Sequence, residues 1–133
     1  MIGLADIRDW LDSLGAIDAV WTIGRFESDQ MQRACVYQRS DYSGATVSIG
    51  GRDSTKTLEK HVQVLIHWNR NHRETEEAAQ ALYDALRFNP RGTIGEDTAS
   101  YIDLKLPEPV DLGSDENGIF ERVLWLDIYY EEA

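Results

Sequence analysis

The chain has 133 residues, 42% of them hydrophobic, and its 24 acidic and 13 basic residues give a formal net charge of −11. This balance disfavours binding to a nucleic-acid backbone, which depends on cationic side chains. The single cysteine, Cys35, excludes an internal disulfide framework, and no stretch approaches the roughly 18 consecutive apolar residues of a membrane span. The N-terminal sequence "MIGLADIRDW" lacks the basic start and apolar run of a signal peptide. We therefore expect folding in a reducing cytoplasm and no membrane partner.

The first third of the chain predicts one helix and several strands. Helical spacing of apolar residues predicts an amphipathic helix over residues 4–14, with Gly15 placed to end it in a left-handed conformation. β-branched and aromatic residues predict strands over 19–23 and 34–38. A further strand over 46–49 follows the turn-forming segment "RSDYSG". Residues 34–49 are therefore expected to form a projecting hairpin.

The clearest strand signal covers residues 61–68, followed at once by a helix. The even-numbered positions of this strand are all apolar, while the odd ones are mostly polar: Val62, Val64, Ile66 and Trp68 make the apolar face. The helix is predicted to begin at Asn71, where Glu74 three residues later suits a capping box. Pro90 and Gly92 mark its exit.

The last third predicts two strands separated by a polar loop. Residues 102–106 alternate as a half-buried strand, and residues 110–118 are expected to be a loop in which Asn117-Gly118 forms a type I′ turn. The strand over 121–130 is apolar on both faces, which is typical of a central or doubly covered strand. Asp127 interrupts one of those faces, so it needs a partner or solvent.

Together these elements predict an α+β fold. We expect one domain over residues 1–133, with a mixed, mainly antiparallel sheet and two helices packed against it.

Two loops have a superficial likeness to ligand-binding motifs. In "GSDENG", placing Gly118 at the sixth position of a calcium loop puts Gly113 at the first and Leu124 at the twelfth, so both essential ligands are missing. In "GGRDSTKT", Thr55 stands where a phosphate loop needs glycine before Lys-Ser/Thr. Polar turns explain both segments better, and we expect no metal and no cofactor.

The sequence also carries no recognisable catalytic motif. His61 and His67 share one strand face, but the strand rise separates them by about 20 Å, too far to hold one metal. Cys35 lies among apolar neighbours and is expected to act as a small hydrophobe. We therefore expect no enzyme and assign no catalytic residue. A small enzyme or ligand-binding domain that uses His61, His67 or Cys35 remains an alternative.

The order of these elements resembles a known family. The helix "ADIRDWLDSLG", the strand "VQVLIHW" running straight into "NHRETEEAAQALYDAL", and the loop "DLGSDENGIFER" before a closing strand resemble the small minor capsid, or tail terminator, proteins of long-tailed bacteriophages. The resemblance extends from about Leu4 to Tyr130. It implies a structural virion protein that forms a ring, commonly a hexamer, on the end of the tail tube, stops tube polymerisation and joins the tail to the head.

The resemblance also implies partners. These are further copies of the chain, the major tail tube protein and head-completion proteins at the head–tail junction, with assembly in the host cytoplasm. DNA would pass through the ring without specific binding, because an acidic lumen repels phosphate. Candidate contact residues are polar positions of the predicted hairpin and of the acidic turn: Arg39, Asp41, Tyr42, Arg52, Asp53, Asp115 and Glu116. The alternatives are a head-completion protein, meaning a stopper or adaptor of the connector, and a monomeric adaptor for basic peptides.

Overall fold

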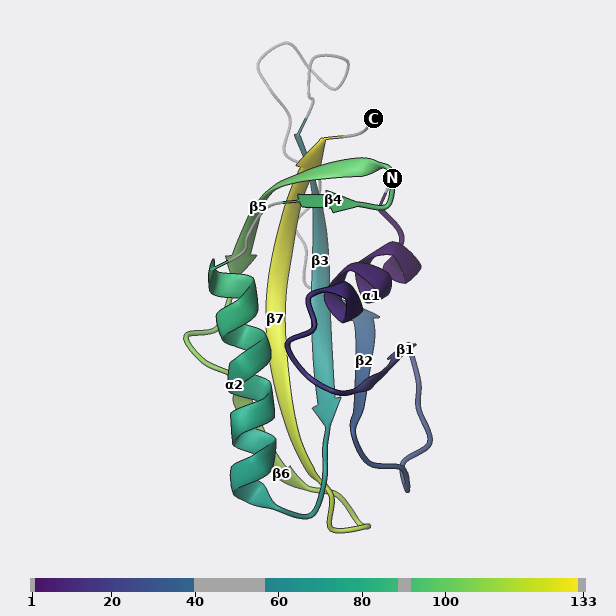
Figure 1. Cartoon of the computed structure of the whole chain (residues 1–133), viewed down its shortest axis with the longest axis vertical. Helices are drawn as coiled ribbons and strands as arrows, with labels where there is room; N and C mark the ends of the chain where they lie inside the picture. The colour runs from purple at the N-terminus through teal and green to yellow at the C-terminus, as the bar shows by residue number, and fades with distance from the viewer. Residues whose placement is uncertain (1, 40–56, 89–91, 132–133) are drawn as a thin grey trace.

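The structure is a computed structural model that describes residues 2–39, 57–88 and 92–131. Within these ranges the chain forms two helices and seven strands (Figure 1). In chain order they are α1 (Leu4–Ser13), β1 (Val20–Ile23), β2 (Arg33–Gln38), β3 (Thr57–His67), α2 (His72–Phe88), β4 (Gly92–Ile94), β5 (Asp97–Leu104), β6 (Val110–Ser114) and β7 (Phe120–Glu131).

The strands form one mixed sheet in the order β1-β2-β3-β7-β5-β4, with β6 also paired to β7. Only β1 and β2 are parallel among these pairs. β7 is the central strand: β3 borders it on one side, while β5 and β6 follow one another along the other side. The predicted α+β fold with a mainly antiparallel sheet is confirmed, and so is the central place of the last strand.

Both helices cover the same face of the sheet, in front of it as viewed in Figure 1. The even-numbered side chains in the middle of β3 and β7 point to this face and are at most 1% exposed: Val62, Val64, Ile66, Leu124, Leu126 and Ile128. For β3 this is the face that the alternation over residues 61–68 predicts. The helices add an apolar stripe each, which includes Ile7 and Leu11 of α1 and Leu82 and Leu86 of α2. Burial of each such aliphatic side chain is worth about 1.5–3 kcal/mol. This covered face therefore contains the main hydrophobic core.

The start of α2 is capped, although not by the predicted pair alone. Asn71 Oδ1 accepts a hydrogen bond from the backbone N–H of Glu74 at 3.1 Å, as expected for an N-cap. The Glu74 carboxylate does not return to Asn71 and instead accepts from Asn69 Nδ2 at 2.9 Å. Asn69 Oδ1 accepts from the N–H of Asn71 at 2.9 Å. Asn69 thus replaces Glu74 in the reciprocal half of the predicted box.

The acidic turn also differs from its predicted type. A type I′ turn needs a positive φ at both central residues, yet only Gly118 (φ 76°) has one. Gly118 N–H donates to Asp115 O at 3.0 Å, and Asp115 N–H donates to Ile119 O at 3.0 Å. This is a three-residue hairpin loop that ends in a left-handed glycine. The segment before it, predicted as loop, is strand β6, and β4 was likewise not predicted.

The predicted hairpin over residues 34–49 is not supported by the pairing of its first arm. Over residues 33–36, β2 has β1 on one side and β3 on the other, so it is an inner strand there. The second arm, residues 46–49, lies outside the described residues.

Candidate assembly surfaces

The face of the sheet opposite the helices carries a buried ionic cluster. Arg39 Nη2 lies 2.7 Å from Asp127 Oδ1, and His61 Nδ1 lies 2.7 Å from the same oxygen. The Arg39 guanidinium also donates to the carbonyls of Val62 and Leu126 at 3.4 and 3.3 Å. Arg39 and Asp127 are only 7% and 3% exposed. Arg39, His61 and Asp127, called here the Asp127 cluster, provide the partner that the sequence requires for Asp127.

The Asp127 cluster has one feature in common with a catalytic triad, a carboxylate that holds a histidine. In a triad the second ring nitrogen faces a nucleophile. Here His61 Nε2 lies 3.5 Å from Glu59 Oε2, so the ring sits between two carboxylates. This arrangement fits a role in holding neighbouring strands together.

His67 and Cys35, the other two residues of the enzyme alternative, are buried. His67 is inaccessible, with Nδ1 at 3.0 Å from Glu121 Oε2 and Nε2 at 2.9 Å from the carbonyl of Ser28. Phe26 packs on its ring at a centroid distance of 4.6 Å. Cys35 is fully buried, as expected of a small hydrophobe. Among the described residues, no group of three or more His, Cys, Asp or Glu side chains could hold a metal ion.

Three ionisable groups near these strands have shifted pKa values. Burial is the main cause that raises the pKa of the Tyr37 phenol, and a hydrogen bond with the Cys35 side chain is the second. Burial and the nearby Glu59 charge raise that of Tyr129. A hydrogen bond to Asp103, followed by the charges of Asp103 and Asp127, raises the pKa of Lys105. All three shifts favour the protonated forms that these groups already have near neutral pH.

The acidic residues around the β6–β7 hairpin have internal roles. Asp115 Oδ1 accepts from the N–H groups of Asn117 and Ile119 at 2.9 and 3.0 Å, which closes the turn. Asp111 accepts from His72 Nε2 at 2.9 Å and lies 3.5 Å from Arg122. The His72 hydrogen bond, the Gly113 N–H and the Arg122 charge lower the pKa of Asp111. Glu116 is exposed at the tip of the loop.

The candidate contact residues are therefore differently placed. Arg39 is buried in the Asp127 cluster because the carboxylate of Asp127 draws its guanidinium inward. Asp115 caps a turn, and Glu116 is the member of the set that the structure places on the surface. Asp41, Tyr42, Arg52 and Asp53 lie outside the described residues.

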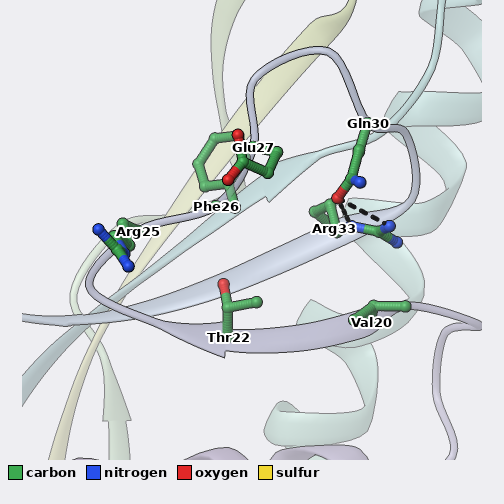
Figure 2. Close-up of a pocket in the computed structure, with 7 residues that line it drawn as sticks. All are labelled: Val20, Thr22, Arg25, Phe26, Glu27, Gln30 and Arg33. Atoms are coloured by element: carbon green, nitrogen blue, oxygen red, sulfur yellow. Dashed lines mark hydrogen bonds between the residues drawn. The ribbon is translucent and has the colours of Figure 1, made fainter.

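Sequence reasoning missed two surfaces at opposite edges of the sheet. The first, called the β1 edge, is the outer side of β1 with a hollow of about 480 Å³ beside it (Figure 2). Two arginines and one carboxylate line this hollow together with Val20 and Thr22: Arg25, Arg33 and Glu27. Val20 is 53% exposed. The Arg33 guanidinium bonds the neutral amide oxygen of Gln30 at 3.0 and 3.2 Å. Neither arginine has a carboxylate partner in the part of the chain that the structure describes.

The second surface, called the β6 edge, is the outer side of β6 together with a hollow of about 300 Å³ next to α2. Val110 and Leu112 of β6 are 39% and 51% exposed. The hollow is mainly acidic, and its lining residues are Glu76, Glu77, Gln80, Glu108, Pro109 and Arg122. The sequence signal for this edge was the alternation of apolar and polar residues in Val110-Asp111-Leu112, which Gly113 cuts too short to predict a strand.

Among the described strands, this small α+β protein has open sheet edges at β1 and β6, and an open edge is a template for pairing with another chain. The family of bacteriophage tail terminator proteins matches residues 2–132, nearly the whole chain. The chain therefore belongs to this family, and the predicted resemblance is confirmed. It is a structural tail protein, a component of the virion, and its family is not an enzyme family. A search of curated proteins found no match. No helix within the described residues is long and apolar enough to cross a membrane.

Proposed function

We propose that this protein forms a ring, with six copies as the expected number, on the end of the completed tail tube and stops further polymerisation. The observation that carries the proposal is the family match over residues 2–132. Capping works by asymmetry: one face of the ring matches the tube end, and the other does not, so that no further tube subunit can add. The face away from the tube would then receive the head-completion proteins.

The charge supports the part of the proposal that concerns DNA. A net charge of −11 per copy gives the ring a strongly negative field, which repels phosphate and lets the genome pass without being held. On this proposal the protein lies at the head–tail junction after assembly in the host cytoplasm. Glu116 on its exposed loop is the described candidate for contact with a partner.

Tail tubes grown in the presence and absence of the purified chain test the proposal. We expect the protein to bind one end of each tube, visible by electron microscopy, and to stop elongation when fresh tube protein is added. Native mass spectrometry of the bound species gives the copy number. Binding to DNA-filled heads without any effect on tubes would instead identify a head-completion protein. Elongation that continues at the same rate with the protein present would refute termination.

A further inference from the structure

The β1 edge and the β6 edge lie at the same level of the sheet. The register can be followed from one edge to the other through five strands, β1, β2, β3, β7 and β6. Two such rows are Val20–Arg33–His67–Glu121–Gly113 and Thr22–Cys35–Leu65–Val123–Val110. A second copy placed beside the first at the same height would therefore bring one edge directly against the other.

Both edges have unused pairing capacity. Among the described strands, β1 pairs with β2 alone, and β6 pairs with β7 alone. Each therefore has a row of backbone N–H and C=O groups without a strand partner, which is the usual template for adding a strand. The two edges have similar lengths, four residues in β1 and five in β6.

The strand directions also suit pairing between copies. β1 is parallel to β2, and each later step from β2 to β3, β7 and β6 is antiparallel. β1 and β6 of one copy therefore run in opposite directions. When a neighbour continues the sheet in the same orientation, its β6 lies antiparallel to β1, the slightly more stable arrangement.

The side chains at the two edges are complementary. The two register rows align Val20 with His67 of β3 and Val110 with Val123 of β7. These odd-numbered positions of β3 and β7 point away from the helices. Val20 and Val110 therefore both point to the face of the sheet without helices. Both are exposed in the single chain and would be covered by edge pairing. Thr22 adds a buried hydroxyl with no hydrogen-bond partner in the described residues, pointing into the hollow of the β1 edge (Figure 2). A buried hydroxyl without a partner costs free energy.

The charged side chains differ between the two edges. The hollow of the β1 edge has two arginines, Arg25 and Arg33, and one carboxylate, Glu27, whereas the hollow of the β6 edge has three carboxylates and one arginine: Glu76, Glu77, Glu108 and Arg122. The first hollow is therefore net positive and the second net negative, and contact between unlike edges is favoured over contact between like edges. Arg33 lies on the face without helices, while Glu76 and Glu77 belong to α2 on the other face, so this preference comes from the overall charge of each edge rather than from direct ion pairs.

We propose that the β1 edge of one copy pairs with the β6 edge of the next, so that the sheets of neighbouring copies join into one continuous sheet. The contact is head to tail, and a head-to-tail contact closes into a ring when the rotation between copies fits. The inference rests on the proposed function, because it names the contact that holds the proposed ring together.

Two lysine variants test this contact. Val20→Lys introduces a charge at the β1 edge, and Leu112→Lys does so at the β6 edge, each at an exposed position. Tyr101→Lys, at a 55% exposed position of β5, is the matched control. We expect the first two variants to lose assembly, measured by native mass spectrometry and by capping of tail tubes, while the control assembles like the wild type. Circular dichroism confirms that all three variants are folded.

Mixing the two variants gives the sharpest result. Val20→Lys keeps an intact β6 edge, and Leu112→Lys keeps an intact β1 edge, so the mixture can make one good contact and no more. We expect a one-to-one dimer, captured by cross-linking, from two variants that are each monomeric. A mixture with no captured dimer would overturn the inference, and so would assembly by either variant alone.

The proposed function can fail separately. Capping by the wild type and by both lysine variants refutes the edge contact and leaves termination standing. A wild-type chain that neither assembles nor caps tubes refutes both.

Discussion

The two faces of the sheet use the same central strand in opposite ways. On the covered face, Leu124, Leu126 and Ile128 of β7 pack beneath the helices and contribute through apolar burial alone. On the other face, Asp127 is equally buried but is held by Arg39 and His61. Burial by itself therefore does not show how a position is stabilised.

The difference has an energetic consequence. An apolar face loses stability in proportion to the volume removed, and its neighbours can relax partly into the gap. A buried ion pair loses far more when one partner is removed, because the other charge remains in a poorly solvated place. Variants of Asp127 and Leu82 test this contrast, and two smaller effects, at the start of α2 and at Asp111, follow in order of expected size.

Asp127→Asn should cost about 3–5 kcal/mol of unfolding free energy, because it removes the carboxylate that binds the buried Arg39 guanidinium at 2.7 Å. Urea unfolding followed by tryptophan fluorescence measures the loss. The matched control is Asp103→Asn, which removes a carboxylate opposite Asp127 whose side chain is 34% exposed, and should cost at most about 1 kcal/mol. The double variant Arg39→Met/Asp127→Leu should be more stable than Asp127→Asn, since it removes both charges. Equal losses in the two would contradict the electrostatic account.

Leu82→Ala, on the covered face, should cost about 3 kcal/mol, within the range of roughly 2–5 kcal/mol for buried leucines. Leu82 is inaccessible and belongs to the core beneath α2. Gln80→Ala on the exposed side of the same helix is the control and should change stability by about 0.5 kcal/mol or less. The same urea titration compares them. A loss as small as that of the control would show that α2 packs loosely on the sheet.

Asn71→Ala should cost about 1 kcal/mol, because it removes the side-chain acceptor for the Glu74 N–H at the start of α2. Asn71→Asp keeps an acceptor there and should retain the stability of the wild type. Thermal unfolding by circular dichroism separates the two. If alanine and aspartate behave alike, Asn69 alone is enough to cap the helix.

The smallest expected effect is a pH dependence at Asp111. Its pKa is lowered in the folded protein, first by the hydrogen bond from His72, so its contribution to stability is complete above the ordinary carboxyl pKa of 3.8. That contribution is lost as the pH falls below 3.8 through the lowered folded-state value. Melting temperatures from pH 2 to pH 6 should converge for wild type and Asp111→Asn at the acid end and separate above about pH 4. Glu116→Gln, an exposed change on the same hairpin, should show the same dependence of melting temperature on pH as the wild type.

Much of the fold follows from local patterns. The period of apolar residues predicted both helices and the strands over 61–68, 102–106 and 121–130, and β-branched and aromatic residues predicted those over 19–23 and 34–38; they correspond to β3, β5, β7, β1 and β2. The features that local patterns did not predict, strand β6 and the position of Arg39, depend on residues distant in the sequence. β6 contains Gly113 and an exposed face, and it becomes a strand through pairing with β7. Arg39 was predicted to lie on a contact surface, but its place is decided by Asp127, 88 residues further along the chain.

The candidate surfaces show the same limit. The acidic excess was plain from composition, whereas the placing of Glu76, Glu77 and Glu108 at the edge opposite Arg25 and Arg33 was not. Residues 25 and 33 are far from residues 76, 77 and 108 in the sequence, and only the strand order sets them at opposite edges. A strand lies at an edge because no further strand pairs with one of its sides, and the periodicity of apolar residues does not show which strands pair.

The central position of β7 also bears on how the protein is made. β7 is the last of the described strands, yet it borders β3, β5 and β6, and its pairing with β3 joins residues as distant as Thr57 and Glu131. Contacts of such long sequence separation form slowly, because the intervening chain must be ordered first. During synthesis β3, β5 and β6 remain without their shared neighbour until residues 120–131 have left the ribosome. The nascent chain thus exposes sheet edges until the final strand arrives, and this interval is when it is most prone to pair with the wrong chain.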